Sequence, residues 1–156
     1  MIIEIGALER REGVVQVDRY GSPDVRADIR ALPFRHLDRI EASHVLEHVP
    51  DADIVVALKS CRRALKPEGI LDIHVPDLLW AMRRFLRSQS QGERWGFWQR
   101  FIYGSQAGEG QFHQTGFSVK RLSDCLVAAG FRTVRVNRIR REEHMKEVEV
   151  HGVATA

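Results

Sequence analysis

The sequence of 156 residues has only two cysteines, and it lacks any apolar run near the ~18 residues that span a bilayer. Cys61 and Cys125 are too far apart for metal-ligand spacing, so we expect both to be reduced core residues. Residues 1–4 contain no basic stretch of the kind that opens a secretory signal. We therefore expect one unexported, cytoplasmic domain over residues 1–156, with no membrane segment.

A large excess of charge of either sign is also missing. The chain has 24 basic and 21 acidic residues, a net charge of +3, with 44% hydrophobic residues, which excludes a disordered chain. The densest basic stretch is followed at once by Glu142 and Glu143, so we interpret it as a solvated edge and do not expect nucleic acid as a partner. Its arginines are Arg132, Arg135, Arg138, Arg140 and Arg141.

The first half of the chain alternates between strand and helix patterns. Short apolar runs predict strands at residues 2–6, 14–18, 24–28, 39–43 and 70–75. Between the last two, Ile54, Leu58, Cys61 and Leu65 recur at helical spacing, and Pro67 and Gly69 end that helix. A strand, a helix, a turn and a strand form a βαβ unit, which predicts a parallel sheet.

The second half is predicted to be helical over residues 78–104, where most of the aromatic residues lie, and to form a loop over 105–117. Ser118 then caps a helix that Gly130 ends. Two strands, 131–139 and 146–154, complete an α/β domain.

The predicted strands end in residues that suit a nucleoside. The first three end at Gly6, Asp18 and Asp28. In an open α/β sheet, ligands bind beyond the carboxyl ends of the strands. A glycine allows close approach, one carboxylate can accept both hydroxyls of a ribose, and another can accept an exocyclic amine.

Six segments in chain order carry a resemblance to one family. They are 4–6 (Glu-Ile-Gly), 15–18 (Val-Gln-Val-Asp), 27–34 (Ala-Asp-Ile-Arg-Ala-Leu-Pro-Phe), 42–49 (Ala-Ser-His-Val-Leu-Glu-His-Val), 65–71 (Leu-Lys-Pro-Glu-Gly-Ile-Leu) and 128–131 (Ala-Ala-Gly-Phe). In this order they resemble a small class I S-adenosylmethionine-dependent methyltransferase of the type-11 kind, over nearly the whole chain.

The resemblance implies a Rossmann-like, mostly parallel sheet with an antiparallel C-terminal strand. It implies S-adenosylmethionine as the cofactor, methyl transfer to a small-molecule or glycan-type acceptor, and an acceptor-side insertion or lid over residues 78–117. The residues that would contact the cofactor are Glu4, Gly6, Asp18, Asp28, Ile29, Ser43 and His44.

Three features depart from the family pattern. Leu8 stands where the family has a second glycine, which would crowd the methionine end of the cofactor. The connections after the first and second strands are too short for a full crossover helix, so the first two family helices are expected to be absent or reduced. No helix is expected before the first strand. An alternative is therefore a non-catalytic methyltransferase-like binding domain with a degenerate cofactor loop.

Residues 44–48 also read as His-x-x-Glu-His, a pattern of zinc metallopeptidases. That interpretation needs a long helix through His44, and Pro50 would break such a helix. The methyltransferase resemblance explains the same residues without a metal, so we expect no metal site.

His113 is the candidate catalytic residue, as a base for a hydroxyl or amine acceptor, with a loop-bracing role as the alternative. Asp72 and His74 share one face of a strand and are interpreted as a structural polar pair. The aromatic segment 95–103 spreads apolar surface around more than one helix face, which predicts either a lid on the cleft or a homodimer contact.

Overall fold

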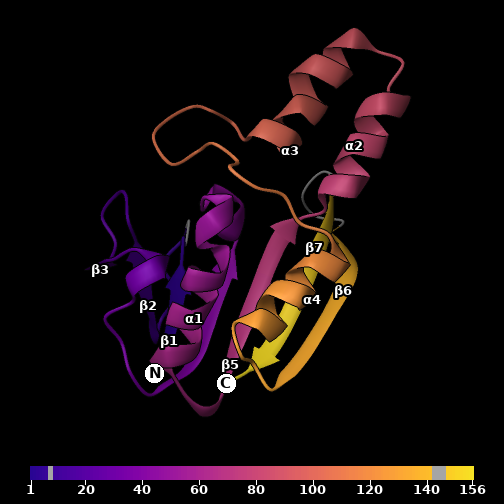
Figure 1. The fold of residues 1–156 in the computed structure, drawn as a ribbon. Helices are drawn as coiled ribbons and strands as arrows, with labels where there is room; N and C mark the ends of the chain where they lie inside the picture. Colours follow the sequence, from indigo (N-terminus) through magenta and orange to yellow (C-terminus); the bar gives the residue numbers. More distant parts are fainter. Residues whose placement is uncertain (7–8, 142–146) are drawn as a thin grey trace.

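The computed structural model describes residues 1–6, 9–141 and 147–156. They form a seven-stranded sheet in the order β3-β2-β1-β4-β5-β7-β6 (Figure 1). Neighbouring strands are parallel except at β7, which is antiparallel to both β5 and β6. The predicted parallel sheet with an antiparallel strand in the C-terminal hairpin is confirmed. The strands are β1 (Ile2–Ile5), β2 (Val14–Asp18), β3 (Val25–Arg26), β4 (Leu37–Ser43), β5 (Leu65–Pro76), β6 (Thr133–Arg141) and β7 (Glu147–Thr155).

Two of the helices, α2 and α4, begin after residues whose side chains satisfy free backbone N–H groups. Ser118 Oγ accepts a hydrogen bond from the N–H of Arg121 at the start of α4, as predicted, and Gly130 follows that helix at φ +90°. Asp77 caps α2 in the same way. No described helix has the length and apolarity to cross a membrane. The helical segments are η1 (Ile29–Ala31), η2 (Leu46–His48), η3 (Asp51–Asp53), α1 (Ile54–Ala64), α2 (Leu78–Arg87), η4 (Glu93–Trp98), α3 (Gln99–Tyr103) and α4 (Val119–Ala128).

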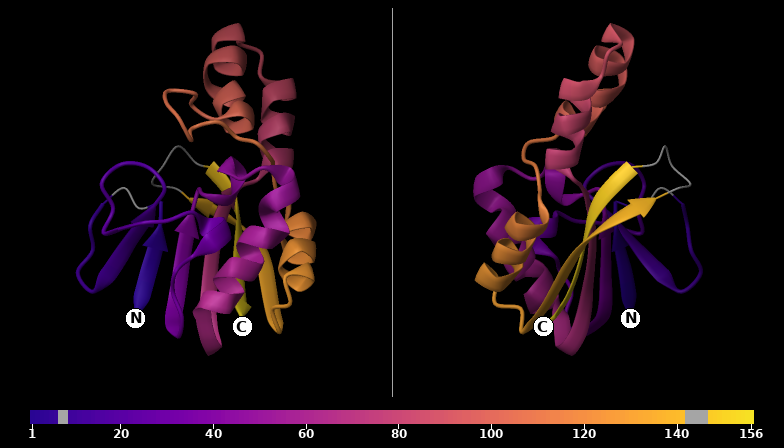
Figure 2. Two further views of the ribbon diagram at one scale, coloured as in Figure 1. Left: turned by 60° about the vertical axis from the view of Figure 1, so that its left-hand side comes forward. Right: turned by 90° about the vertical axis from the view of Figure 1, so that its right-hand side faces the viewer.

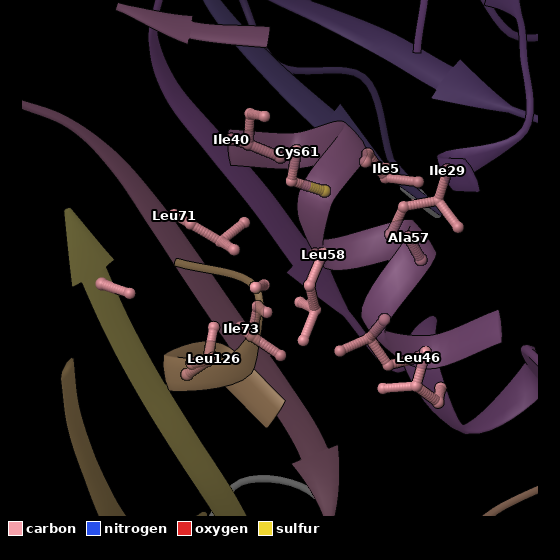
Figure 3. Packing of buried hydrophobic residues seen from close by; sticks show 14 of the residues in the cluster. Ile5, Ile29, Ile40, Leu46, Ala57, Leu58, Cys61, Leu71, Ile73 and Leu126 are labelled. Carbon is pink, nitrogen blue, oxygen red and sulfur yellow. The ribbon is translucent and has the colours of Figure 1, made fainter. Parts of the chain in front are cut away.

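One face of the sheet is covered by α1 and α4. Leu58 and Cys61 of α1 point toward Leu71 and Ile73 of β5, and Leu126 of α4 packs beside them (Figure 3). Burial raises the pKa of the Cys61 thiol to about 12, as expected for a reduced core cysteine. The predicted stripe is therefore the core face of α1 at Ile54, Leu58 and Cys61. Its last residue, Leu65, was wrongly placed in the helix, because α1 ends at Ala64 and Leu65 begins β5.

The other face of the sheet carries no helix among the described residues (Figure 2, right). In the described parts of the β1–β2 and β2–β3 connections, the chain runs as turns and bends, in agreement with the predicted loss of two helices. The strand register places Glu4, Glu41 and Asp72 side by side on this face. Successive side chains of a strand point to opposite faces of the sheet. In β5, Leu71 and Ile73 therefore point into the core, whereas Asp72 between them points to the uncovered face.

The segment 78–104 forms a helical arm above the carboxyl edge of the sheet (Figures 1 and 2). It is not one helix, because the chain breaks at residues 88–90, where Ser88 Oγ donates to a carboxylate oxygen of Glu93 at 2.8 Å. The two halves of the arm pack through aromatic rings, and the ring centroids of Trp80 and Trp98 lie 5.2 Å apart. Trp98 is buried within the arm, against Trp80. The homodimer contact predicted for residues 95–103 stays a prediction.

Candidate functional site

Three predicted site residues meet at one edge of the sheet. Gly6 follows β1, Asp18 ends β2 and Ser43 ends β4, and the parallel register sets the three strand ends level with one another. The strand order changes direction between β1 and β4, because β2 and β3 follow β1 on one side of the sheet and β4 and β5 lie on the other side. A switch point of this kind is where open α/β sheets bind ligands.

Gly6 is required at its position for two reasons. Its φ of +74° is a backbone conformation that side chains disfavour, and a Cβ there would lie 2.7 Å from Cγ2 of Val45. Its N–H donates to the carbonyl oxygen of Val17 at 3.0 Å, which holds the turn against β2. The predicted obstruction by Leu8 lies outside the described residues and stays a prediction.

Asp18 retains acceptor capacity at the end of β2. Its Oδ1 accepts from the N–H of Tyr20 at 2.8 Å, and no described residue donates to its Oδ2. The loop after α3 lies against this turn, because a Cβ on Gly110 would come within 2.3 Å of the Tyr20 ring. The loop at Gly110 therefore lies close to Asp18, the residue predicted to bind the ribose.

Asp28 is less accessible to a ligand than its place in the sequence indicates. Its two oxygens accept from Nε and Nη2 of Arg30 at 2.9 and 2.7 Å, and Arg30 also bonds to Asp53. The hydrogen bond from Arg30 is the main cause that lowers the pKa of Asp28. An adenine amine would have to share the Asp28 carboxylate with the guanidinium of Arg30. Ile29, also predicted to contact the cofactor, is buried in the hydrophobic core.

Glu4 does not join this edge. Its carboxylate lies on the uncovered face of the sheet, 2.8 Å from Nη2 of Arg11. The sequence placed it in the cofactor loop because it precedes Gly6 by two positions. Alternation along β1 sends its side chain to the uncovered face, whereas Gly6 lies beyond the end of the strand.

His44 takes a turn conformation at the end of β4, with φ +55°. Its ring lies between two buried carboxylates, with Nδ1 3.2 Å from Glu47 and Nε2 3.0 Å from Glu149. Burial by itself would lower the pKa of His44, but the hydrogen bonds and charges of Glu149 and Glu47 outweigh it and raise the pKa to about 10. At neutral pH this ring is an imidazolium that joins the two carboxylates.

The metallopeptidase interpretation of residues 44–48 is wrong. Only a short 3-10 turn, Leu46–His48, forms there, and His44 precedes it with positive φ, so the two histidines do not share a helix face. His44 faces Glu149, whereas His48 Nδ1 lies 3.0 Å from the carbonyl oxygen of Phe112. The loop beyond the arm determines the neighbours of His48.

That loop brings His113 next to Glu47 and His48. The His48 and His113 rings meet edge to face with centroids 5.0 Å apart. His113 Nδ1 lies 3.1 Å from the carbonyl oxygen of Phe101, so the predicted bracing bond exists. Its other nitrogen, Nε2, is the atom that remains for chemistry. Burial lowers the pKa of His113, which keeps the ring neutral at neutral pH.

The predicted polar pair of Asp72 and His74 belongs to a larger network on the uncovered face. His151 of β7 stacks on His74 at 4.3 Å and lies 2.8 Å from Asp72, which also bonds to Arg39. Hydrogen bonding from His74 leads the causes that lower the pKa of Asp72 to about 2. Sequence analysis missed His151 and Glu149. They lie two apart on the predicted last strand, which gave no sign that it pairs with β5.

The fold and this edge define the class of protein. A strand order of β3-β2-β1-β4-β5-β7-β6 with β7 antiparallel, and a glycine turn and a carboxylate at the switch point, describe a Rossmann-like class I S-adenosylmethionine-dependent methyltransferase fold.

Comparison with known proteins agrees with this class. The methyltransferase domain family of type 11 matches residues 5–73. A S-adenosylmethionine-dependent methyltransferase from Methanosarcina mazei superposes with a TM-score of 0.62 at 18% identity, over 99% of this chain and 91% of that one. One from Archaeoglobus fulgidus gives 0.66 at 16% identity, over 99% and 85%. No curated protein matches the sequence.

A third similar structure holds ligands. The 1,6-didemethyltoxoflavin-N1-methyltransferase of Burkholderia thailandensis, with bound 1,6-didemethyltoxoflavin and S-adenosylhomocysteine, has a TM-score of 0.63 at 17% identity, over 99% of this chain and 70% of that one. At such identities the likeness establishes the fold. The chain thus has the class I methyltransferase fold, and its residues 5–73 match the type-11 methyltransferase domain family.

Proposed function

We propose that the protein binds S-adenosylmethionine at the carboxyl edge of β1, β2 and β4 and transfers its methyl group to a small-molecule or glycan-type acceptor. The observation that carries the proposal is the pairing of Gly6 with Asp18 at the switch point. The turn at Gly6 admits no side chain beside Val45, and Asp18 keeps one oxygen without a described donor. The sequence match over residues 5–73 includes both residues.

The residues at this edge suit the cofactor in a defined way. Gly6 keeps the backbone of the turn free of a Cβ, Asp18 would accept the ribose hydroxyls, and the peptide at Ser43 and His44 would border the cofactor from β4. Asp28 would reach the adenine amine only in competition with Arg30. The bound cofactor would supply an electrophilic sulfonium methyl group. The chain's contribution is then mainly to hold cofactor and acceptor in line.

We further propose that the segment 78–117 is the acceptor-side lid. The arm stands above the carboxyl edge, and its loop lies against Tyr20 next to Asp18. His113, carried by this loop, is the proposed base: its pKa is lowered by burial, and a neutral ring can take a proton from a hydroxyl or amine acceptor. His113→Ala should then reduce turnover and leave cofactor affinity unchanged.

Calorimetric titration with S-adenosylmethionine and S-adenosylhomocysteine tests the cofactor site. Asp18→Ala should weaken binding of both by about 1.5–3 kcal/mol, the range for hydrogen bonds to a charged group. Asp124→Ala removes an exposed carboxylate on α4 and is the matched control. If folded Asp18→Ala binds like the wild type, the ribose assignment is wrong.

The alternative is a binding domain that no longer transfers methyl groups, and Leu8 is the feature that favours it. Adenosine, 5′-methylthioadenosine and S-adenosylmethionine distinguish the two. Tighter binding of the full cofactor means that its methionine end is held, as an enzyme requires. Equal or tighter binding of the shorter ligands supports the alternative, and Leu8→Gly should then restore affinity for the full cofactor.

A further inference from the structure

Among the described residues, two groups of side chains lie close enough to share a cation. In each, one ligand atom per residue lies within 4.8 Å of the others. The group of Asp72, His74 and His151 is already balanced, because Asp72 bonds to the guanidinium of Arg39 and to His151. The second group is Glu47, His48 and His113, and one carboxylate oxygen of Glu47 has no hydrogen-bond partner among the described residues.

The carboxylate of Glu47 is the first reason to regard the second group as a site. Its side chain is 2% exposed, and its Oε1 lies 3.2 Å from Nδ1 of His44. Its Oε2 is buried and has no hydrogen-bond partner among the described residues. A buried carboxylate oxygen without a donor is strongly disfavoured unless a ligand or an ion satisfies it.

The tautomers of the two histidines are the second reason. Nδ1 of His48 contacts the carbonyl oxygen of Phe112, and Nδ1 of His113 contacts that of Phe101. A carbonyl oxygen can only accept, so each Nδ1 carries a proton, and in the neutral ring Nε2 then has the lone pair that can bind a metal ion. Metal-binding histidines are held in this way, with the second nitrogen donating to a carbonyl or carboxylate.

The loop that carries His113 is firmly attached to the turn that carries Glu47 and His48. The backbone N–H groups of Gln114 and Thr115 both donate to the carbonyl oxygen of Glu47, at 2.7 and 3.3 Å. The Gln114 side chain donates to the carbonyl oxygen of His48 at 2.8 Å. These bonds hold the three side chains together without a ligand, which favours binding because little ordering remains to be done.

Gly104 makes the return of the chain possible. It has φ +82°, and a Cβ there would lie 2.2 Å from the carbonyl oxygen of Gln111 and 2.9 Å from the backbone nitrogen of His113. With no Cβ, the N–H of His113 reaches the carbonyl oxygen of Tyr103 at 3.0 Å. Sequence analysis expected no metal because only the folded loop adds His113 to the residues of the turn.

We propose that Glu47, His48 and His113 bind one divalent transition-metal ion, such as Zn²⁺, through Oε2 and the two Nε2 atoms. Two imidazoles and one carboxylate suit Zn²⁺, Fe²⁺ or Co²⁺, whereas Mg²⁺ and Ca²⁺ prefer oxygen ligands. The imidazolium of His44 faces Glu47 from the other side, but it is shared with the carboxylate of Glu149, so the local charge still favours a cation.

Three protein ligands leave a coordination position open. If the chain is a methyltransferase as proposed above, this position would serve a hydroxyl oxygen of the acceptor, and the ion would lower the pKa of that hydroxyl so that its proton is released to water. The oxygen would then form a bond to the methyl carbon of the cofactor while the bond from that carbon to sulfur breaks, which leaves S-adenosylhomocysteine. His113 then acts as a ligand in the metal-bound protein in place of a direct base. The inferred acceptor class is a molecule with a hydroxyl at the methylated position. Metal binding itself does not depend on the cofactor.

The test is titration of metal-stripped protein with Zn²⁺ by calorimetry and with Co²⁺ by visible absorption, in the absence of S-adenosylmethionine. We expect one ion per chain and no competition from Mg²⁺. Glu47→Gln, His48→Ala and His113→Ala should each weaken binding at least about tenfold. His36→Asn removes an exposed histidine at φ +59°, a conformation asparagine tolerates, and should bind like the wild type.

Three results would overturn the assignment: no binding by the wild type, binding unaffected by His113→Ala, or binding lost in His151→Ala but kept in His113→Ala. Circular dichroism of each metal-free variant checks its fold, and His113→Gln replaces His113→Ala if the latter does not fold. A protein that binds Zn²⁺ but not S-adenosylmethionine would leave this site standing and reject the proposed methyl transfer. The converse would reject the site alone.

Discussion

One face of the sheet lies against α1 and α4 and excludes water, whereas the other meets solvent with ion pairs in place of a helical layer (Figure 2). On the covered side, contacts are apolar and nondirectional, so each residue contributes through burial. On the uncovered side, carboxylates are joined by arginine and histidine side chains in a row that runs from β1 to β7. The ion-pair row consists of Glu4, Arg11, Glu41, Arg39, Asp72, His151, His74 and Glu149.

The difference indicates how a short chain keeps the sheet of a larger fold. Because the described parts of the β1–β2 and β2–β3 connections contain no helix, an apolar second face would leave a large exposed hydrophobic patch that promotes aggregation. Charged side chains make that face compatible with water, and the ion pair of Arg39 with Asp72 joins β4 to β5. The two faces should therefore respond differently to the same kinds of perturbation.

The largest effect is expected on the covered face. Leu58 is fully buried, and Leu58→Ala should lower the free energy of unfolding by about 2–5 kcal/mol through lost burial and a cavity. Val56 lies on the exposed side of the same helix, and Val56→Ala should change it by less than about 0.5 kcal/mol. Urea unfolding of both variants measures this. Similar losses in the two would mean that α1 does not pack as described.

A smaller effect is expected at the centre of the uncovered face. Asp72→Asn should cost about 1–3 kcal/mol at neutral pH, because Arg39 and His151 lose an ionised partner. The pKa of Asp72 in the folded protein is about 2, below the ordinary 3.8. Its ionised form therefore stabilises the fold above about pH 4, and this contribution is lost as the pH falls toward 2.

The pH dependence is the sharper part of that measurement. The difference between wild type and Asp72→Asn in urea unfolding should be constant from neutral pH to about pH 5 and should shrink below it. Leu58→Ala serves as the control, because its cost comes from apolar burial. A pH-independent difference for Asp72→Asn would show that the carboxylate is not preferentially ionised in the folded state.

Local signals predicted the covered face well and the uncovered face only in part. The stripe of α1 and the Ser118 cap depend on near neighbours in sequence, and both are confirmed. The partners of Asp72 depend on β7 inserting between β5 and β6, a long-range pairing that no local pattern shows.

The candidate site divides in the same way. Gly6, Asp18 and Ser43 were predictable because parallel strands end at one edge. Two other expectations changed in the fold. Glu4 points to the uncovered face, and the carboxylate of Asp28 is held by Arg30. His113 was identified as a candidate, but its contact with the Glu47 turn depends on the backbone bonds of a 13-residue loop, which the sequence pattern does not determine.

The helix that closes the covered face should be sensitive at its first residue. Ser118→Ala removes the acceptor for the N–H of Arg121 and should cost about 1 kcal/mol. Ser118→Asp keeps a cap and should recover most of that loss. Thermal unfolding of the three proteins measures it, and equal stability of all three would mean that the cap contributes nothing.

The smallest effect is expected at the exposed end of the ion-pair row, and salt reveals its origin. The Arg11 side chain is 47% exposed while it bonds to both Glu4 and Glu41. Because both ion pairs lie in contact with water, Arg11→Ala should cost only about 0.2–1 kcal/mol at low salt. Charges at the surface are screened over about 10 Å at 0.1 M salt and about 3 Å at 1 M, so the cost should nearly vanish at molar salt. The cost of Leu58→Ala should not decrease with salt, since salt does not weaken apolar burial.

Urea unfolding at both salt concentrations compares the two variants directly. If the cost of Arg11→Ala persists at high salt, the arginine stabilises β1 and β4 through the packing of its aliphatic stem, and the uncovered face depends on more than charge.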